Sequence, residues 1–576
     1  MARGVNAARY PDGLQIADER RPVTDRSYGA EVATVPHSRR KGLGAFYTPP
    51  PMAQALVNWA VQDAQDRVMD GSFGGLAFLS AAHHRLAALG AYQPDVQLYG
   101  CDYDREAFSA ARSFAAGGAT LVRKDFLAVR PGQDLPRVEA VVGNPPYVRY
   151  HSWKTSREKG REIAAAHGVQ LTRLASSWAP LLIHAADFVA PGGRLAQVLP
   201  AELVHAQYAD QVLEYFCQRF HRVVVAMFDA QVFPGAQEEV VLLFADGRGQ
   251  SPAPGVEVLS FDDLHELRIR EEPGEALRVD EEHKLLAGLL SGAAVELYDQ
   301  LRGESARTLG EFASVDIGAV TGANEWFVRP LHAVQGLDSD LARPAISKAT
   351  HVPGARFGAD DLAAMDEAGV PARMLVLNAH HARRKAVQEL VAQGEAKGVH
   401  TRYKTRIRNP WWVLPPSQVA SSPELFLTYM SSEMPRLVTN EVAALSTNTV
   451  HGARLRNGAD PAALAAAFYS SLTMLSAELV GRSYGGGVLK LEPSEAERLV
   501  VAVPTPGCAR MLDDVDRLVR ERRYDDVQDL VDRAVLCEGL GVAAEDIGLL
   551  RGAVERLRGR RRARARRRPA DLRKAS

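Results

Sequence analysis

Between about residues 42 and 250, short apolar segments alternate with alanine-rich helical stretches. This strand–helix alternation predicts an α/β domain whose mainly parallel sheet is covered by helices on both faces. In such sheets, ligands bind at the carboxyl ends of the strands. Strands are expected at Arg67–Asp70, Val96–Asp102, Thr120–Lys124, Val138–Gly143, Arg194–Leu199, Arg222–Phe228 and Val240–Ala245, with helices at Leu76–Leu89 and Arg105–Phe114 among the connections.

A chain of 576 residues is too long for one ordinary domain. The pattern changes predict five parts: an arginine-rich arm over 1–40, the alternating domain over 41–250, a connecting region over 251–304, a second domain over 305–510, and a helical C-terminus over 511–576. The last part ends in an arginine-rich run from Arg556. Such a run is typical of a solvated, disordered tail, and it can add salt-sensitive affinity for DNA.

Cysteine usage and hydropathy exclude several classes of protein. The four cysteines are scattered, without a CxxC pair or histidines at metal-ligand spacing, so neither a disulfide framework nor a structural zinc site is expected. The N-terminus lacks the apolar core of a signal peptide, and no run approaches the ~18 apolar residues that a membrane span needs. A soluble, cytoplasmic protein without a metal is therefore expected. The net charge of −1 does not by itself indicate a nucleic-acid partner.

The sequence Asn144-Pro145-Pro146-Tyr147 directly follows the apolar strand VEAVVG. It could form a simple turn, but nothing after it resembles a hairpin partner. Consecutive prolines fix φ and remove backbone donors. The Asn144 side-chain oxygen and the Pro145 carbonyl could then accept both hydrogens of a planar NH₂ group and direct its lone pair toward an electrophile. Tyr147 offers a flat face to an extruded base, worth roughly 1–3 kcal/mol.

Other motifs precede this one in the expected sheet. Thr48 and the prolines after it are typical of a helix N-cap with proline at the first helical position. In Val68–Leu79, a strand, an acidic residue and a glycine-bearing turn lead into a helix, which is the layout of an adenosyl-binding loop. Asp102 ends the next strand, where a carboxylate can accept from both ribose hydroxyls. Asp104 is expected to cap the following helix.

Taken in order, these motifs resemble the gamma-class amino-methyltransferases, the N6-adenine DNA methyltransferases of restriction–modification systems. The resemblance covers about residues 42–250 and, more loosely, the C-terminal domain. It implies a Rossmann-like S-adenosylmethionine-dependent methyltransferase sheet of the α/β class, followed by an α+β target-recognition domain. Asn144, Pro145, Pro146 and Tyr147 would be catalytic, without a metal or a covalent cysteine. Cytosine C5 methylation would need a cysteine after a proline, and none of the four is so placed.

The resemblance also implies roles for single residues. Tyr47, Thr48 and Pro49 would touch the methionine part of S-adenosylmethionine, whose amino end Asp70 would hold, and Gly74 would let the backbone approach. Asp102 would bind the ribose, while Tyr103, Asp125 and Phe126 would surround the adenine ring. Phe233 would sandwich the target base with Tyr147, unless it is a core residue. The chain departs from the family pattern at two positions, with Gly71 where the family has proline and Leu76 where it has glycine.

Basic and aromatic residues in the second domain are candidates for contacts with DNA. One cluster contains Arg402, Lys404, Arg406 and Arg408, followed by Trp411, a mixture that suits a nucleic-acid groove. A second cluster, His380–Lys385, is nearly as consistent with a solvated helix face. Asp316–Asn324 and Ser483–Lys490 resemble target-recognition segments of the family. Their glycines could allow close approach to DNA or simply form tight turns.

These expectations combine into site-specific methylation of N6 of a flipped adenine in double-stranded DNA. The roughly 40 residues before the catalytic domain are too few for a nuclease, so a separate restriction endonuclease is the expected functional partner. Two alternatives remain open at this point. The same chemistry could act on RNA or on protein glutamine, or the chain could be a non-catalytic DNA-specificity component. Leu76 in the glycine loop favours the last alternative, and the intact Asn-Pro-Pro-Tyr motif opposes it.

Overall fold

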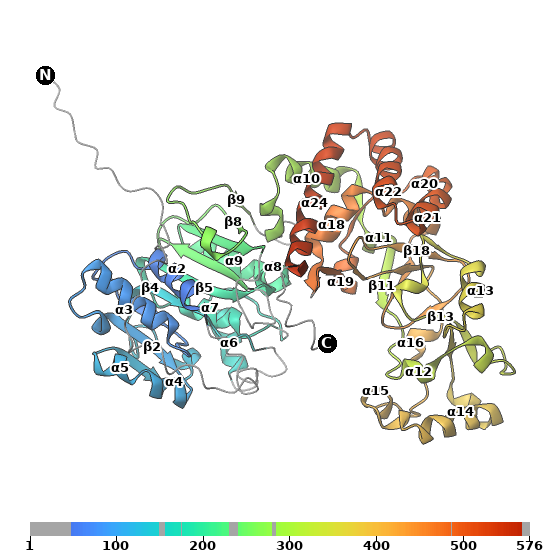
Figure 1. The fold of residues 1–576 in the computed structure, drawn as a ribbon, viewed down its shortest axis with the longest axis horizontal. Coiled ribbons are helices and arrows are strands. Elements are labelled where there is room, and N and C mark those ends of the chain that lie inside the picture. The colour runs from blue at the N-terminus through green and yellow to red at the C-terminus, as the bar shows by residue number, and fades with distance from the viewer. Residues whose placement is uncertain are drawn as a thin grey trace. The chain divides into compact units, whose positions relative to one another are not determined.

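The structure is a computed structural model that describes residues 48–148, 156–173, 175–229, 240–278, 284–484 and 486–566. The expected arm over 1–40 lies outside these residues. The described chain forms two compact units, which divide between Leu289 and Leu290 (Figure 1). Each unit has its own sheets and helices.

The first unit is built on one nine-stranded sheet with the order β3-β2-β1-β4-β5-β7-β6-β8-β9. Neighbouring strands from β3 to β5 run parallel, and β7 lies antiparallel between β5 and β6. This is the methyltransferase sheet that the resemblance implied. The strands are β1 (Val68–Asp70), β2 (Leu98–Asp102), β3 (Thr120–Arg123), β4 (Val138–Gly143), β5 (Val189–Pro200), β6 (Arg222–Phe228), β7 (Val240–Asp246), β8 (Val256–Phe261) and β9 (Ala276–Leu277).

The strand predictions are confirmed, with β4 and β6 at the expected bounds. One difference is that the sheet continues past residue 250. Strand β8 pairs in parallel with β6, and β9 pairs with β8. Part of the region 251–304, expected only to connect two domains, therefore belongs to the first sheet.

Helices cover both faces of this sheet, as predicted. Successive side chains of a strand point to opposite faces, and successive residues of β6 and β7 are buried, so neither face is open to solvent there. Helix α2 packs on α3 and on strands β4 and β5. The single helix expected over Arg105–Phe114 is divided at Ala111, where ψ is 8°. The helices are α2 (Pro50–Ala60), α3 (Ala77–Leu89), α4 (Arg105–Ala110), α5 (Arg112–Ala116), α6 (Arg157–Ala166), α7 (Trp178–Ala186), α8 (Glu202–His205) and α9 (Gln207–Arg219).

The second unit mixes helices with four small sheets of five, four, three and two strands, so it is α+β as expected. Its five-stranded sheet has the order β11-β20-β16-β18-β14. The strands are β10 (Ala306–Thr308), β11 (Ala313–Ile317), β12 (Val328–Arg329), β13 (Ala342–Ile346), β14 (Arg356–Phe357), β15 (Arg373–Leu375), β16 (Leu425–Leu427), β17 (Met430–Ser431), β18 (Leu437–Asn440), β19 (Leu445–Ser446), β20 (His451–Leu455), β21 (Arg482–Tyr484), β22 (Val488–Lys490) and β23 (Val500–Ala502).

One apolar core of this unit surrounds Trp326, Phe327 and Trp412. Among the described residues no single helix is long and apolar enough to cross a membrane, although the bent pair α17 and α18 meets the length and composition criteria together. The helices are α10 (Gly292–Glu304), α11 (Leu309–Phe312), α12 (Asn324–Phe327), α13 (Ala359–Glu367), α14 (Lys385–Ala396), α15 (Tyr403–Arg406), α16 (Pro416–Val419), α17 (Pro461–Ala467), α18 (Ser471–Val480), α19 (Pro493–Ala496), α20 (Pro506–Arg510), α21 (Leu512–Arg520), α22 (Tyr524–Val531), α23 (Glu538–Leu540) and α24 (Ala544–Arg566).

The start of the arginine run differs from the expected disordered tail, because α24 continues to Arg566. The reason is a buried ion pair between α24 and α18. Arg561 is only 4% exposed, and its Nη2 and Nε lie 2.7 and 3.0 Å from the two carboxylate oxygens of Glu478. Arg561 also donates to the carbonyl of Gly487, beside β22. This arginine therefore stabilises the second unit.

We expect Arg561→Ala to lower the free energy of unfolding of the second unit by about 3 kcal/mol, because it leaves the Glu478 carboxylate buried. Arg562→Ala is the matched control on the same helix. The Arg562 side chain is 35% exposed and pairs with Glu433 at the surface, so its loss should cost less than about 1 kcal/mol. Urea denaturation followed by tryptophan fluorescence compares the two variants. Equal effects would contradict a structural role specific to Arg561.

Candidate active site

Three predicted site residues of the first unit lie at one edge of the sheet. Asp70 ends β1, Asp102 ends β2, and Asn144 follows β4 directly. Strand β1 lies between β2 and β4, and in the parallel register Asp70 stands opposite Gly100 and Val142. The carboxyl ends of three adjacent strands thus bring these polar side chains to the edge where ligands bind in α/β sheets.

Asp70 is the most buried carboxyl group at this edge, with 2% of its surface exposed. Its Oδ1 accepts a hydrogen bond of 2.9 Å from the backbone N–H of Ser72. Burial raises the pKa of Asp70 to about 7. None of the ion pairs in the described chain involves Asp70. A buried carboxyl group of this kind suits a ligand that carries an ammonium group.

Asp102 fixes the glycine loop to the end of β2. Its Oδ2 accepts from the N–H of Gly74 at 2.9 Å, and its Oδ1 accepts from the N–H of Asp104 at 2.8 Å. Burial raises the pKa of Asp102 above its ordinary value. The adjacent Tyr103 is 56% exposed, so its ring is accessible to a ligand. The prediction that Asp104 caps the next helix is confirmed, because its side chain accepts from Glu106 N–H.

The two departures from the family pattern have physical explanations. Leu76 has a φ of 65°, the left-handed conformation in which glycine is normally favoured. The loop thus turns without the expected glycine, at a cost of about 1–2 kcal/mol. A Cβ atom at Gly71 would lie 2.8 Å from the ring of Phe126. Glycine at position 71 therefore makes room for that ring.

Phe126 and Asp125 both contact protein groups in the structure. The Phe126 ring is 6% exposed, and its centroid lies 4.9 Å from His184 and 5.3 Å from Phe188. Asp125 accepts from Leu127 N–H at 3.1 Å and from the hydroxyl of Ser156. These contacts hold the segment after β3 in place beside the loop that follows β1.

The amide of Asn144 is hydrogen-bonded at both ends. Its Nδ2 donates to Thr48 Oγ1 at 3.1 Å, and its Oδ1 lies 2.5 Å from the hydroxyl of Tyr147. The same hydroxyl lies 3.0 Å from the carbonyl oxygen of Val198 on β5. Tyr147 is 8% exposed. The Asn-Pro-Pro-Tyr segment therefore folds back on itself, and its aromatic ring is anchored at the hydroxyl end.

Ser177, at the start of α7, holds the other side of this motif, although it is not among the residues predicted from sequence. Its hydroxyl donates to the Pro146 carbonyl and accepts from Val148 N–H at 2.8 Å. Its own N–H donates to the Val148 carbonyl at 3.1 Å. No hydrogen bond within the described residues uses the Pro145 carbonyl, which leaves that oxygen available as an acceptor. No sequence signal marked Ser177, because the contact joins residues about 30 positions apart.

The alternative interpretation of Thr48 as a helix N-cap is wrong. Helix α2 begins at Pro50 with Pro49 as its N-cap residue. Thr48 is 7% exposed and accepts from Asn144 instead, because the three prolines after it place the helix start one residue later. Tyr47 and Phe233, predicted to contact cofactor and base, lie outside the described residues.

The basic cluster around α15 contains exposed and engaged side chains. Lys404 and Arg406 are exposed, as is the ring of Tyr403, at 64%. Arg402 forms an ion pair with Glu325. The structure therefore places two cations and one aromatic ring of the predicted DNA-binding cluster together at the surface.

The other two residues of that cluster are engaged in the fold. Arg408 donates to the carbonyl oxygens of Val320 and Thr321. Trp411 packs against Trp326, with ring centroids 4.8 Å apart. Arg408 thus braces the segment before α12, and Trp411 packs on α12 itself, so the cluster is only partly available to a ligand.

Glycines in the two segments that resemble target-recognition segments are explained mainly by the packing and turns of the chain itself. A Cβ at Gly318 would lie 2.3 Å from the Thr447 carbonyl oxygen, and one at Gly322 would lie 2.5 Å from Lys404 Cβ. Gly486 and Gly487 have φ of 85° and 73° between β21 and β22, as a tight turn requires. In the cluster His380–Lys385, Arg384 pairs with Asp338 and Asp340.

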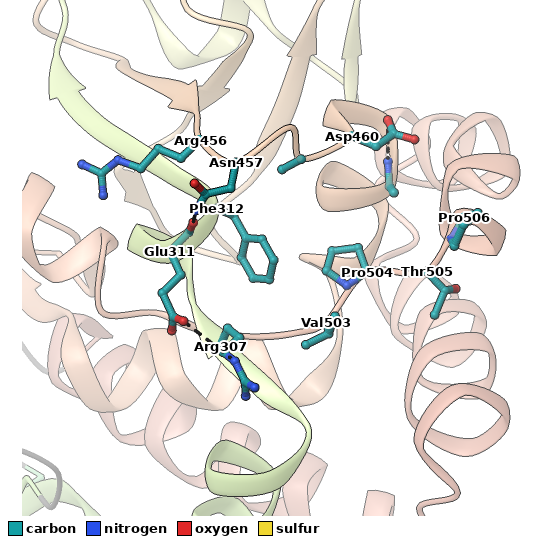
Figure 2. A pocket seen from close by; sticks show the side chains of 12 residues that line it. Arg307, Glu311, Phe312, Arg456, Asn457, Asp460, Val503, Pro504, Thr505 and Pro506 are labelled. Atoms are coloured by element: carbon teal, nitrogen blue, oxygen red, sulfur yellow. Dashed lines mark hydrogen bonds and ion pairs between the residues drawn. The ribbon is translucent and has the colours of Figure 1, made fainter.

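A pocket of about 380 Å³ lies in the second unit, beside β10, β23 and α17 (Figure 2). Its polar rim is occupied by contacts within the protein. Arg307 lies 3.8 Å from Glu311, Asn457 donates to the Glu311 carbonyl, and Asp460 caps α17. None of the residues predicted to bind cofactor or DNA lines it. Among the described residues, no group of three or more His, Cys, Asp or Glu side chains is arranged to hold a metal ion.

The sheet order, the acidic residues at its carboxyl edge and the Asn-Pro-Pro-Tyr segment after β4 define an α/β methyltransferase. Residues 28–246 match the family described as N-6 DNA Methylase, and residues 282–536 match the C-terminal domain of the type II methyltransferase M.Eco57I. These two matches lie side by side along the chain, which is an adenine-specific DNA methyltransferase of the restriction–modification type.

Two curated relatives are similar over most of their length. The type II methyltransferase M.XamI of Xanthomonas campestris pv. amaranthicola is 27% identical over 490 residues, which cover 80% of this chain and 85% of the relative. M.AccI of Acinetobacter calcoaceticus is 20% identical over 490 residues, covering 82% and 87%. The cryoEM structure of a DrdV–DNA complex matches 84% of this chain and 58% of that chain with a TM-score of 0.50 and 12% identity, a likeness of fold alone.

Proposed function

We propose that the chain methylates N6 of an adenine rotated out of duplex DNA, uses S-adenosylmethionine as methyl donor, and protects DNA from a separate restriction endonuclease. The observation that carries this proposal is the convergence of Asp70, Asp102 and Asn144 at the carboxyl edge of one sheet. The type II methyltransferases among its relatives support the link with a restriction system.

The residues at this edge fit S-adenosylmethionine by their chemistry. The buried Asp70 carboxylate would bind the ammonium group of the methionine part, and the Asp102 oxygens would accept from the ribose hydroxyls. The exposed Tyr103 ring would lie against the adenine. The cofactor supplies an electrophilic methyl group on a sulfonium centre. The protein needs only to hold this group in line with the attacking nitrogen.

Asn144 and Pro145 would orient the amine of the target base. The amide oxygen of Asn144 and the carbonyl oxygen of Pro145 accept its two hydrogens, so the nitrogen lone pair is directed toward the methyl group. Ser177 fixes the backbone just beyond, through Pro146 and Val148. Acceptors held in place before the reaction need no reorganisation during it. Tyr147, and Phe233 beyond the described residues, would contact the flipped base.

The reaction is tested by incubating the purified chain with radiolabelled S-adenosylmethionine and mixed plasmid DNA. We expect label in N6-methyladenine, and a loss of at least about 100-fold in rate in Asn144→Ala, because the main acceptor for the amine is gone. Retained binding of the cofactor is the control for folding. Label in RNA or protein but not in DNA would contradict the proposed substrate.

Cofactor binding should depend on pH through Asp70. Because burial raises its pKa to about 7, the carboxyl group is neutral below that pH and ionised above it. An ammonium ligand requires the ionised form. Below pH 7 the affinity should therefore fall as the pH is lowered, and the fall should approach about tenfold per pH unit. Calorimetric titration with S-adenosylmethionine between pH 5.5 and 7.5 measures this slope. The Asp70→Asn variant should bind the cofactor weakly, and its affinity should not change with pH. The same pH dependence in this variant would show that another group is responsible.

For DNA, the exposed Lys404 and Arg406 are the proposed phosphate contacts, with Tyr403 beside them. Each substitution, Lys404→Ala or Arg406→Ala, should weaken binding and reduce the slope of log K against log salt by about 1. Arg408→Ala is the contrasting variant, because its guanidinium bonds to Val320 and Thr321. It should lower the unfolding temperature. Fluorescence anisotropy with a labelled duplex, from about 50 to 200 mM salt, gives the slopes. Slopes equal to that of the wild type would contradict phosphate contacts by Lys404 and Arg406.

A further inference from the structure

We propose that Thr48 is a positioning residue for methyl transfer, which fixes the end of the Asn144 amide that faces the incoming amine. This inference rests on the proposed function, and it extends that function to a side chain expected only to touch the cofactor. The observation behind it is the hydrogen bond of 3.1 Å from Asn144 Nδ2 to Thr48 Oγ1, across 96 positions of sequence.

Orientation matters because the two ends of an amide have opposite properties. The oxygen accepts hydrogen bonds and the NH₂ group donates them. An amine can therefore be held only by the oxygen end, and an amide turned by 180° would oppose two donors to each other. In the structure the NH₂ end of Asn144 faces Thr48, and its oxygen faces Tyr147.

Thr48 is well suited to hold this orientation because its own position is fixed. It is 7% exposed, and the next three residues are prolines with restricted φ. The helix that they open, α2, packs on β4 and β5 through a face that includes the fully buried Met52 and Leu56. Strand β4 leads directly into Asn144, so the two partners of the bond are joined to elements that pack on each other.

Tyr147 cannot select the orientation alone. Its hydroxyl lies between Asn144 Oδ1, at 2.5 Å, and the Val198 carbonyl oxygen, at 3.0 Å. With the amide as observed, the hydroxyl donates to Asn144. With the amide reversed, it could accept from Nδ2 and donate to Val198 instead. Both arrangements are satisfied at this end, so the Tyr147 hydroxyl does not fix the orientation by itself.

Thr48 would select the orientation once its single proton is engaged elsewhere. A hydroxyl has one hydrogen to donate. If that hydrogen is donated to the carboxylate of the bound methionine part, Thr48 can only accept from Asn144. The amide must then present its NH₂ group to Thr48 and its oxygen to the amine. Binding of the cofactor is thereby coupled to the orientation of the Asn144 amide, and so to binding of the target base. By linkage, cofactor and DNA must change each other's affinity by the same factor.

Thr48→Val and Thr48→Ser test the proposal in the full chain. Valine keeps the shape and removes the hydroxyl, whereas serine keeps the hydroxyl. We measure the single-turnover rate at saturating S-adenosylmethionine and DNA, and the affinity for a short duplex with and without S-adenosylhomocysteine. Thr120→Val, at an exposed position of β3, is the control for an unrelated threonine in the same unit.

We expect Thr48→Val to lower the single-turnover rate about tenfold, as the loss of one hydrogen bond predicts, and to remove the gain in DNA affinity that S-adenosylhomocysteine gives the wild type. Thr48→Ser should restore both to within about threefold. If Thr48→Val weakens only cofactor binding, with an unchanged rate at saturation, the proposal fails and Thr48 is simply a cofactor contact. Equal losses in the serine variant would also overturn it. A wild-type chain that transfers no methyl group to DNA would instead contradict the proposed function.

Discussion

The parallel pairing of β1 with β2 and β4 is the constraint on which the candidate site depends. Asp70 stands opposite Gly100 and Val142 in this register, so the chain leaves three adjacent strands at one edge of the sheet. A slip of one residue would turn the Asp70 side chain to the opposite face. The burial of β1 at every residue makes such a slip costly, since apolar side chains would lose their contacts. The positions of the acidic residues and of Asn144 therefore follow from core packing.

Much of this sheet could be predicted from sequence, because buried parallel strands are short apolar runs between turn residues. The bounds of β4 and β6 were predicted correctly for that reason. Strand β8 was not recognised as part of the sheet. It contains Glu257, which suggests a solvated segment, yet that carboxylate is almost fully buried in an ion pair with Arg222 on β6. Pairing across strands compensates for the buried charge, and sequence alone does not identify the partner.

The candidate site also contains some residues that can be predicted from sequence and others that cannot. Asp102 and the Asn-Pro-Pro-Tyr segment are recognisable because their chemistry is local to a few residues. Thr48 and Ser177 act through contacts with a segment about 96 and 30 positions away, which no local pattern encodes. In the basic cluster, composition does not distinguish the exposed Lys404 from Arg408, whose guanidinium is used by two backbone carbonyls. Whether an arginine is free for DNA depends on acceptors that only the folded chain supplies.

The closed arrangement of the Asn-Pro-Pro-Tyr segment is itself a form of preorganisation. An adenine amine that reaches Asn144 would meet an oxygen already engaged by the hydroxyl of Tyr147. That hydroxyl has a second acceptor, the Val198 carbonyl, 3.0 Å away. A rotation about one bond can therefore release the Asn144 oxygen without leaving a buried donor unsatisfied, which would otherwise cost about 1–3 kcal/mol. The resting hydrogen bond keeps the amide in place, and its alternative partner keeps the cost of admitting the substrate low.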